Sequence, residues 1–178
     1  MLITLILILI IIICLILILY VTTYNNLATY KTKIEKAESI IDDALREKYD
    51  IICKLNIQIK KEVTKKDYLK DYIELKDKRI TNYEMDRKLT EAMNIITEVK
   101  NDHEKLNNKE FNELLKKIDE LNETLASSKT YYNNNTSKLN QIIRKFPSNI
   151  VAKIHRYKIK PFFDGKNMQD AVIDDFKL

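Results

Sequence analysis

The chain has 178 residues, of which 45% are hydrophobic and 32% charged, and its formal net charge is +5. Its single glycine excludes the glycine-rich loops that bind phosphates or dinucleotides. Its two cysteines, about forty residues apart, exclude a disulfide scaffold, and the scarcity of Gly and Pro favours long helices over tight turns.

The first predicted element is an apolar run from Leu2 to Val21 that contains no charge, Pro or Gly. At about 1.5 Å per residue, about twenty residues give roughly 30 Å, which is the thickness of a bilayer's hydrocarbon core. A cleaved signal peptide would need a basic start, a shorter apolar core and a small-residue cleavage site, features that this run lacks. We therefore predict an uncleaved transmembrane helix over residues 2–21.

Basic residues flank this helix on its C-terminal side, at Lys31, Lys33 and Lys36. Because positively charged flanks stay in the cytoplasm, we predict a single-pass protein of the cell membrane with its N-terminus outside and the rest inside.

After the apolar run, hydrophobic residues recur at three- and four-residue steps, with a gap near Tyr49, and form one stripe of an amphipathic helix. No helix breaker separates this stripe from residues 2–21, so we predict one continuous helix. It either extends to about Arg79, before a capping-box spacing at Thr81 and Glu84, or ends at a weaker break near Thr64. The stripe consists of Leu27, Tyr30, Ile34, Ala37, Ile41, Leu45, Ile52, Leu55, Ile59 and Val63.

Two further long helices are predicted. The second fades at residues 101–103, and the third begins near Asn107 and ends at Pro147, because proline disfavours a helical conformation at the residue before it. The second stripe consists of Met85, Leu89, Ala92, Met93, Ile96 and Val99. The third consists of Phe111, Leu114, Leu115, Ile118, Leu121, Leu125, Tyr132, Leu139, Ile142, Ile143 and Phe146.

Ser148 is expected to cap a short last helix over residues 149–157, before an irregular tail. Amphipathic helices cannot bury their stripes alone. The predicted fold is therefore all-α: an N-terminal transmembrane helix that continues into an antiparallel helical bundle of three long helices, plus a short C-terminal helix. The predicted organisation is a transmembrane helix at 2–21, a cytoplasmic bundle at 22–160 and a tail at 161–178.

Residues for chemistry are sparse, and we predict no catalytic, cofactor-binding or metal site. His103 and His155 match neither a zinc-protease motif nor the Glu-x-x-His pairs of di-iron bundles, so they are interpreted as a helix-end and a surface residue. The acidic patch within residues 42–50 is interpreted as a solvated face, since Asp42 pairs with Arg46 four residues on.

The basic excess lies near the C-terminus, because residues 124–163 hold eight bases and no acid. Aromatic residues at helical spacing among these bases are expected in the core, so nucleic-acid binding is not expected. Anionic lipid headgroups attract such a segment by about 1 kcal/mol per base, and an acidic protein partner is an equal alternative. The candidate contacts to an anionic surface are Arg144, Lys145, Lys153, Arg156, Lys158 and Lys160.

Three ordered blocks carry a resemblance to a known family. The first is Tyr24-Asn25-x-Leu27, Ala37, Ile41-Asp42, Leu45 and Tyr49-Asp50-Ile51-Ile52-x-x-Leu55. The second is Tyr132-Asn133, Asn140, Ile143, Phe146-Pro147-Ser148-Asn149 and Ile150-Val151-Ala152-Lys153, and the last is Tyr157-Lys158-x-Lys160-Pro161-Phe162-Phe163-Asp164. In these positions the chain resembles the LemA family of bacterial membrane proteins. It departs where the family has Pro at Cys53, Tyr at Leu139 and Phe-Gly at His155-Arg156.

The resemblance implies an anchor with its N-terminus outside, a cytoplasmic helical bundle and no established enzymatic activity. The missing proline at Cys53 implies a straighter first helix. The leading interpretation is a non-enzymatic scaffold that presents a bundle surface to a protein partner, with a homo-oligomer left open and a lipid-surface accessory as the alternative. The family positions expected to be structural, or alternatively partner-binding, are Tyr24, Asn25, Asp42, Asp50, Tyr132, Asn133, Asn140, Phe146 and Pro147.

Overall fold

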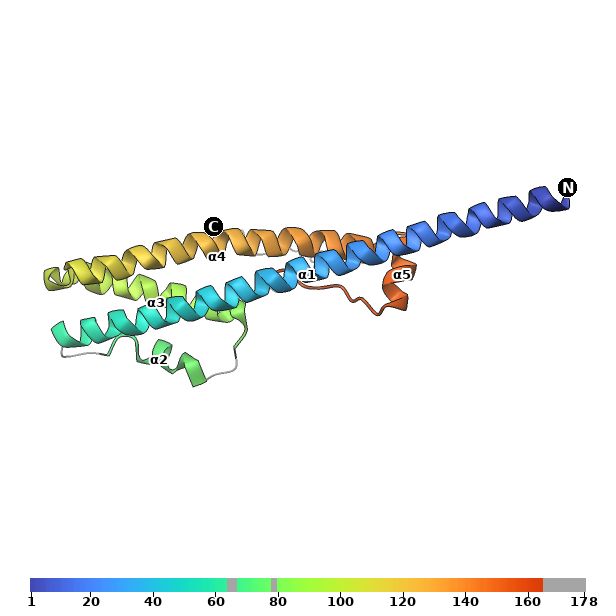
Figure 1. Ribbon diagram of the computed structural model, residues 1–178. Helices are drawn as coiled ribbons and strands as arrows, with labels where there is room; N and C mark the ends of the chain where they lie inside the picture. Colours follow the sequence, from blue (N-terminus) through green and yellow to red (C-terminus); the bar gives the residue numbers. More distant parts are fainter. Residues whose placement is uncertain (64–66, 78–79, 165–178) are drawn as a thin grey trace, which may run out of the picture. The chain divides into compact units, whose positions relative to one another are not determined.

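The computed structural model describes residues 1–63, 67–77 and 80–164, and every regular element in these ranges is helical (Figure 1). The elements are α1 (Leu2–Glu62), α2 (Lys70–Ile73), the 3-10 turn η1 (Glu74–Asp77), α3 (Asn82–Asp102), the 3-10 turn η2 (Glu104–Leu106), α4 (Lys109–Arg144) and α5 (Ser148–Ile154). The all-α prediction is confirmed. The predicted tail lies outside the described residues from position 165 onward.

The chain forms two compact units. One comprises Met1–Lys36 with Tyr131–Leu178, and the other comprises Ala37–Thr130. Both α1 and α4 contribute to each unit, so each unit is described by itself below.

Helix α1 is uninterrupted over 61 residues, which confirms the prediction of one continuous helix. It passes Cys53 without a break, as the absence of proline there implies. By length and composition, α1 is the one helix within the described ranges that is long and apolar enough to cross a membrane, and none of its most apolar stretch is buried in protein. The core helix of a soluble protein would bury that stretch, so the exposure is consistent with membrane anchoring.

The unit of residues 37–130 is built on the predicted stripes. From Ala37 to Ile59 every predicted position of α1 is buried, and Tyr49 fills the gap in the stripe, where it is 9% exposed and donates a hydrogen bond to the Ile73 carbonyl. Leu89, Ala92, Ile96 and Val99 of α3 and Phe111, Ile118 and Leu125 of α4 complete the core. Full burial of each Leu, Ile, Val or Phe side chain stabilises the folded state by about 1.5–3 kcal/mol.

Helix α1 ends at Glu62, close to the weaker of the two predicted breaks, whose Thr64 lies outside the described residues. Residues 67–77 form α2 and η1 instead of prolonging α1, so the extension toward Arg79 is wrong. The predicted capping box opens the next helix: Thr81 accepts from the Glu84 amide at 3.2 Å, and Glu84 accepts from the Thr81 amide at 3.0 Å.

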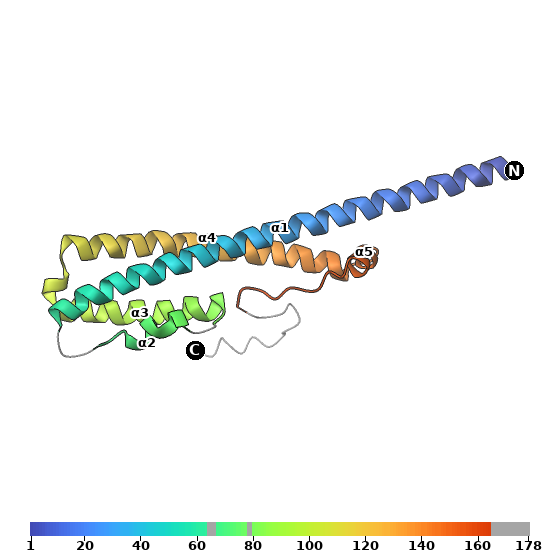
Figure 2. The same ribbon diagram turned by 60° about the horizontal axis from the view of Figure 1, so that its bottom comes forward.

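Because α2 and η1 lead the chain back along α1, α3 runs in the same direction as α1, and α4 runs antiparallel to both (Figure 2). One polar cluster joins all three helices. Lys48 is only 3% exposed and donates to Asn122 at 2.8 Å, while Lys129 pairs with Asp86 at 2.5 Å. Burial lowers the pKa of Lys48, more than Asp86 raises it, and Lys129 adds to the lowering.

In the other unit, the chain turns sharply at the end of α4. Phe146 was expected in the third apolar stripe, and this is wrong: α4 stops at Arg144, and Phe146 is 74% exposed. Because Pro147 disfavours a helical backbone conformation at the residue before it, α4 ends before Phe146. The Phe146 side chain therefore does not continue the apolar stripe.

Ser148 was expected to cap the last helix, and this is also wrong. Its hydroxyl lies 2.8 Å from the Ile142 carbonyl and 2.6 Å from the Lys145 carbonyl, so its one proton is directed back at the end of α4, and the Lys145 carbonyl also accepts from the Asn149 amide. Pro147 holds the N-cap position of α5, which ends at Ile154, three residues before the predicted end.

Candidate functional site

The segment that follows α5 is tied to α4 through its backbone. Asn140, which is 1% exposed, donates from Nδ2 to the Lys160 carbonyl at 2.7 Å and accepts from the Lys160 amide at 2.9 Å. One side-chain amide thus takes the place of a strand partner. Since this segment has no helical hydrogen bonds of its own, the pair satisfies backbone groups that burial would otherwise leave unpaired.

Two more family positions on α4 bind the same segment. Tyr132 donates its hydroxyl to the Pro161 carbonyl at 3.1 Å, and Asn133 accepts from the Phe163 amide at 2.9 Å. The rings of Tyr132 and Phe163 meet edge to face at 6.3 Å, and the Lys160 ammonium lies over the Tyr132 ring. Tyr132, Asn133 and Asn140 therefore all hold the chain that follows α5.

The end of α5 contacts the end of the apolar run of α1. His155 Nε2 and the Tyr20 hydroxyl are 2.7 Å apart, and the His155 ring lies 4.6 Å from the ring of Tyr24. His155 is thus exposed, as predicted, but it also forms a specific contact. Tyr24 is half-exposed beside it, whereas Asn25 is exposed on α1.

The turn after α5 has an arginine at the position where the resemblance described above implies glycine. Arg156 has a φ of 56°, in the left-handed region. The Tyr157 amide bonds the Ala152 carbonyl, and the Arg156 amide bonds the Lys153 carbonyl, which together form a Schellman motif with Arg156 in the glycine position. The special turn is therefore kept despite the substitution.

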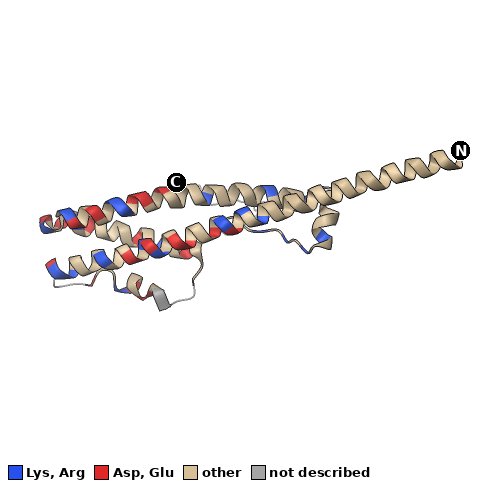
Figure 3. Ribbon diagram, in the orientation of Figure 1, with Lys and Arg blue, Asp and Glu red and all other residues tan. Residues whose placement is uncertain are grey.

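The candidate anionic contacts lie in and around this turn, and we call residues 144–160 the basic segment. Arg144, Lys145, Lys153, Arg156 and Lys158 are exposed. Lys160 is half-buried against Tyr132, so it is the least available of the six. Figure 3 shows basic residues on α5 and on the chain that follows it, close to the uncharged first part of α1.

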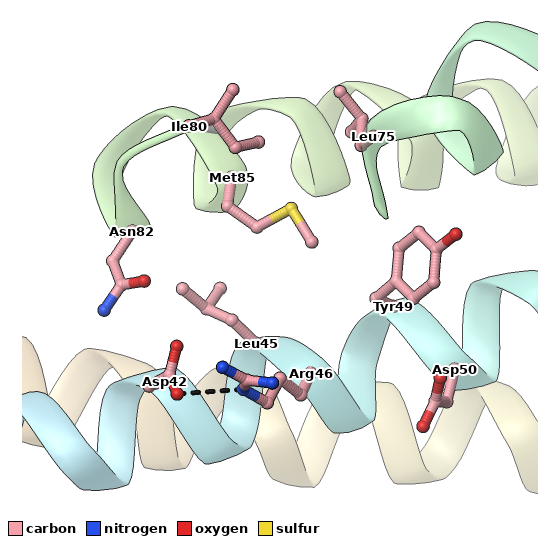
Figure 4. A pocket seen from close by; sticks show the side chains of 9 residues that line it. All are labelled: Asp42, Leu45, Arg46, Tyr49, Asp50, Leu75, Ile80, Asn82 and Met85. Carbon is pink, nitrogen blue, oxygen red and sulfur yellow. Dashed lines mark hydrogen bonds and ion pairs between the residues drawn. The ribbon is translucent and has the colours of Figure 1, made fainter. Parts of the chain in front are cut away.

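The unit of residues 37–130 carries a cleft of about 420 Å³ between α1, η1 and the start of α3 (Figure 4). Leu45 and Met85 point toward each other across its middle, and Tyr49 stands at one end. The family positions Asp42 and Asp50 both line it. The remaining lining residues are Arg46, Leu75, Ile80 and Asn82.

Little in this cleft suits acid–base or metal chemistry. Asp42 accepts from Arg46 Nε at 2.8 Å, as the spacing of the two residues predicts, so its charge is compensated. Across residues 1–63, 67–77 and 80–164, no group of three or more His, Cys, Asp or Glu side chains could hold a metal ion. His103 terminates α3, as expected of a helix-end residue. An amphipathic cleft of this kind can accept a side chain or a helix face of a partner.

Sequence reasoning missed two parts of these sites. The contact between His155 and Tyr20 joins residues far apart in the chain, and no periodicity indicates it. Lys48 was not singled out among the charged residues that lie between the apolar positions of the first helix. Its position between Leu45 and Ile52 on the buried face of α1 was the signal that it lies in the bundle.

Comparison with curated proteins and with solved structures gives no match. A protein-family model does match, over residues 37–175, and its description is the LemA family. The match includes Asp42, Asp50 and the positions from Tyr132 to Pro147, and it begins after Tyr24 and Asn25. Because it covers well over half of the sequence, the chain belongs to the LemA family.

Proposed function

We propose that the protein is a membrane-anchored, non-enzymatic helical scaffold, held in the bilayer by residues 2–21, with its N-terminus outside and its helical units in the cytoplasm. The observation that carries the proposal is the single uninterrupted helix α1, which joins an apolar stretch of bilayer length, none of it buried in protein, to the buried core of the bundle. The LemA family is not a known enzyme family.

The proposed membrane orientation is supported by positive charge that the fold brings close to the C-terminal end of the apolar run. Lys31, Lys33 and Lys36 follow the apolar run, Lys153 lies on α5, and Arg156 lies in the turn directly after it, next to His155, which contacts Tyr20. Positive charge close to one end of a membrane helix favours the cytoplasmic side for that end.

The proposed partner surface is the cleft lined by Asp42 and Asp50. An open, amphipathic cleft that is lined by the Asp50 carboxylate suits a basic, apolar protein segment. The test is site-directed photo-crosslinking in cells, with the crosslinker at Asn82 on the cleft and, as the control, at exposed Lys117 on α4.

We expect a discrete adduct from position 82 and none from 117. The adduct should disappear in Asp50→Lys and persist in Asp119→Lys, the matched charge reversal on α4. Identical adducts from both positions, or insensitivity to Asp50→Lys, would remove this surface. An adduct of twice the chain's mass would identify the partner as a second copy.

A second function, binding of anionic lipid by the basic segment, is supported by the contact of His155 with Tyr20 and Tyr24, because it brings the exposed bases to the end of the apolar run. The full chain in nanodiscs of mixed phosphatidylcholine and phosphatidylglycerol tests it, with native mass spectrometry of the retained lipid. We expect enrichment of the anionic lipid that falls by about fivefold or more for each base reversed among Lys153, Arg156 and Lys158, because removal of one positive charge alone costs about 1 kcal/mol. Reversal of Lys116 and Lys117 is the control, and equal lipid ratios in all variants would refute the idea.

A further inference from the structure

Apolar side chains are exposed in the turn between α4 and α5 and on one side of α5, while the other side of α5 is packed against the protein. Phe146, Ile150 and Ile154 are 74%, 52% and 60% exposed, and they recur every four residues. Val151 and Ala152, on the other side of α5, are buried at 7% and 1% exposure. Residues four apart share one face of a helix, so Ile150 and Ile154 form an apolar face that the protein leaves uncovered.

The contact of His155 places this face at a defined depth along α1. Tyr20 lies in the last turn of the apolar run, and Tyr24 lies one turn further. The polar headgroup region adds roughly 5–8 Å on each side of the hydrocarbon core, which corresponds to about four or five residues of helix rise. The end of α5 is therefore level with the headgroups if residues 2–21 span the core.

The direction of α5 suits the same location. In Figure 1, α5 is turned across the N-terminal half of α1 instead of running alongside it. A helix that crosses a membrane-spanning helix lies near the membrane plane. Lys145, Lys153 and Arg156 are exposed around the apolar face, and this combination of apolar side chains with a basic rim is typical of interfacial helices.

We propose that Phe146, Ile150 and Ile154 insert at the boundary of headgroups and acyl chains, so that α5 is an interfacial helix in the bilayer that α1 spans. The inference rests on the membrane anchoring proposed above. The occupant of the apolar face is lipid, because three side chains are too small a surface for a stable protein interface and because the adjoining bases complement anionic headgroups.

The test exploits the absence of tryptophan from the chain. Ile150→Trp gives a single fluorophore on the face, and the full chain is reconstituted in vesicles that contain lipids brominated near the top of the acyl chains. The control is Tyr131→Trp, because Tyr131 is 45% exposed in the same unit. Lys138 lies over the ring of Tyr30, so position 131 is roughly 25 Å along the helices from Tyr20.

We expect the emission at position 150 to shift to the blue and to fall about twofold in brominated vesicles, as for a side chain at the acyl boundary. The emission at position 131 should stay unchanged. Quenching should persist in pure phosphatidylcholine, because insertion of apolar side chains does not need anionic lipid. Circular dichroism of both variants checks that they fold.

Equal quenching at 150 and 131, or none at either, would overturn the inference. A blue shift at 150 without quenching by brominated lipid would assign the face to a second copy or another protein. The variant Leu9→Trp distinguishes failure of the interfacial helix from failure of the proposed membrane anchoring. If lipid brominated deep in the acyl chains quenches position 9 but not position 150, only the interfacial helix is refuted.

Discussion

Arg156 occupies a backbone position that glycine would fill at lower cost. A left-handed conformation costs roughly 1–2 kcal/mol for a residue with a Cβ, and the C′ position of a Schellman motif favours glycine. We expect Arg156→Gly to raise the free energy of unfolding by about 1 kcal/mol, measured by thermal unfolding in detergent. Lys153→Gly, one turn earlier in α5, should lower it by about 0.5–1 kcal/mol, and a loss of stability in both variants would contradict this account.

Asn140 is the side chain on which the packing of residues 157–163 most depends. Asn140→Ala removes both hydrogen bonds to Lys160 and leaves buried backbone groups unpaired, so we expect a loss of about 2 kcal/mol in unfolding free energy. Hydrogen exchange at the Lys160 amide should accelerate as well. Asn134→Ala, at an exposed neighbouring position on α4, should change neither quantity; unaltered exchange in Asn140→Ala would show that other contacts hold the segment.

Lys48 makes the free energy of unfolding depend on pH in the alkaline range. Burial lowers its pKa below the ordinary value of 10.5, so the charged form destabilises the folded state at neutral pH. Since the unfolded chain binds the proton more tightly, stability rises as pH increases from the folded pKa toward 10.5.

We therefore expect Lys48→Met to be more stable than the natural protein at pH 7, with a difference that shrinks as pH rises. Denaturant unfolding at several pH values measures it. A difference that is constant with pH would mean that Lys48 contributes only through packing and its bond to Asn122. Lys54→Met, on the exposed side of α1, is the control.

At the scale of elements, the start of α3 is set by one capping box. Thr81→Ala removes the hydroxyl that accepts from the Glu84 amide, and we expect a cost of about 1 kcal/mol. Thr97→Ala removes a hydroxyl from the exposed middle of the same helix and should cost nothing measurable. Equal costs in the two variants, by denaturant unfolding, would mean that packing alone determines where α3 begins.

Helix ends differ in how far the sequence predicts them. The capping box at Thr81 and Glu84 is local, and so is the cap at Asn108, whose Oδ1 accepts from the Phe111 amide at 2.9 Å. The end of α4 is not determined locally. Ser148 could have capped α5, but its hydroxyl instead lies against carbonyls at the end of α4. Both choices are compatible with the same local sequence, so the competition is decided by the turn between α4 and α5.

At the scale of the whole molecule, orientation is the property that follows from charge. We expect a cysteine introduced at exposed Asn94 of α3, in a background of Cys14→Ser and Cys53→Ser, to resist a membrane-impermeant maleimide in intact cells. It should react after the membrane is disrupted. Labelling of position 94 in intact cells would reverse the proposed topology, and a cysteine placed before Leu2 provides the reciprocal control.

The amino-acid sequence alone determined the helical class, the bilayer-length apolar run, the buried stripes of α1, α3 and α4 and the family, because these depend on composition, on periodicities of three to four residues and on ordered motifs. Tertiary structure decided that α3 runs parallel to α1, that Lys48 is buried, that Asn140 binds the Lys160 backbone and that α5 crosses α1 beside Tyr20. Each of these depends on residues brought together from distant parts of the chain. A one-dimensional pattern records which face of a helix is apolar, but the partner of that face is selected only when the helices pack.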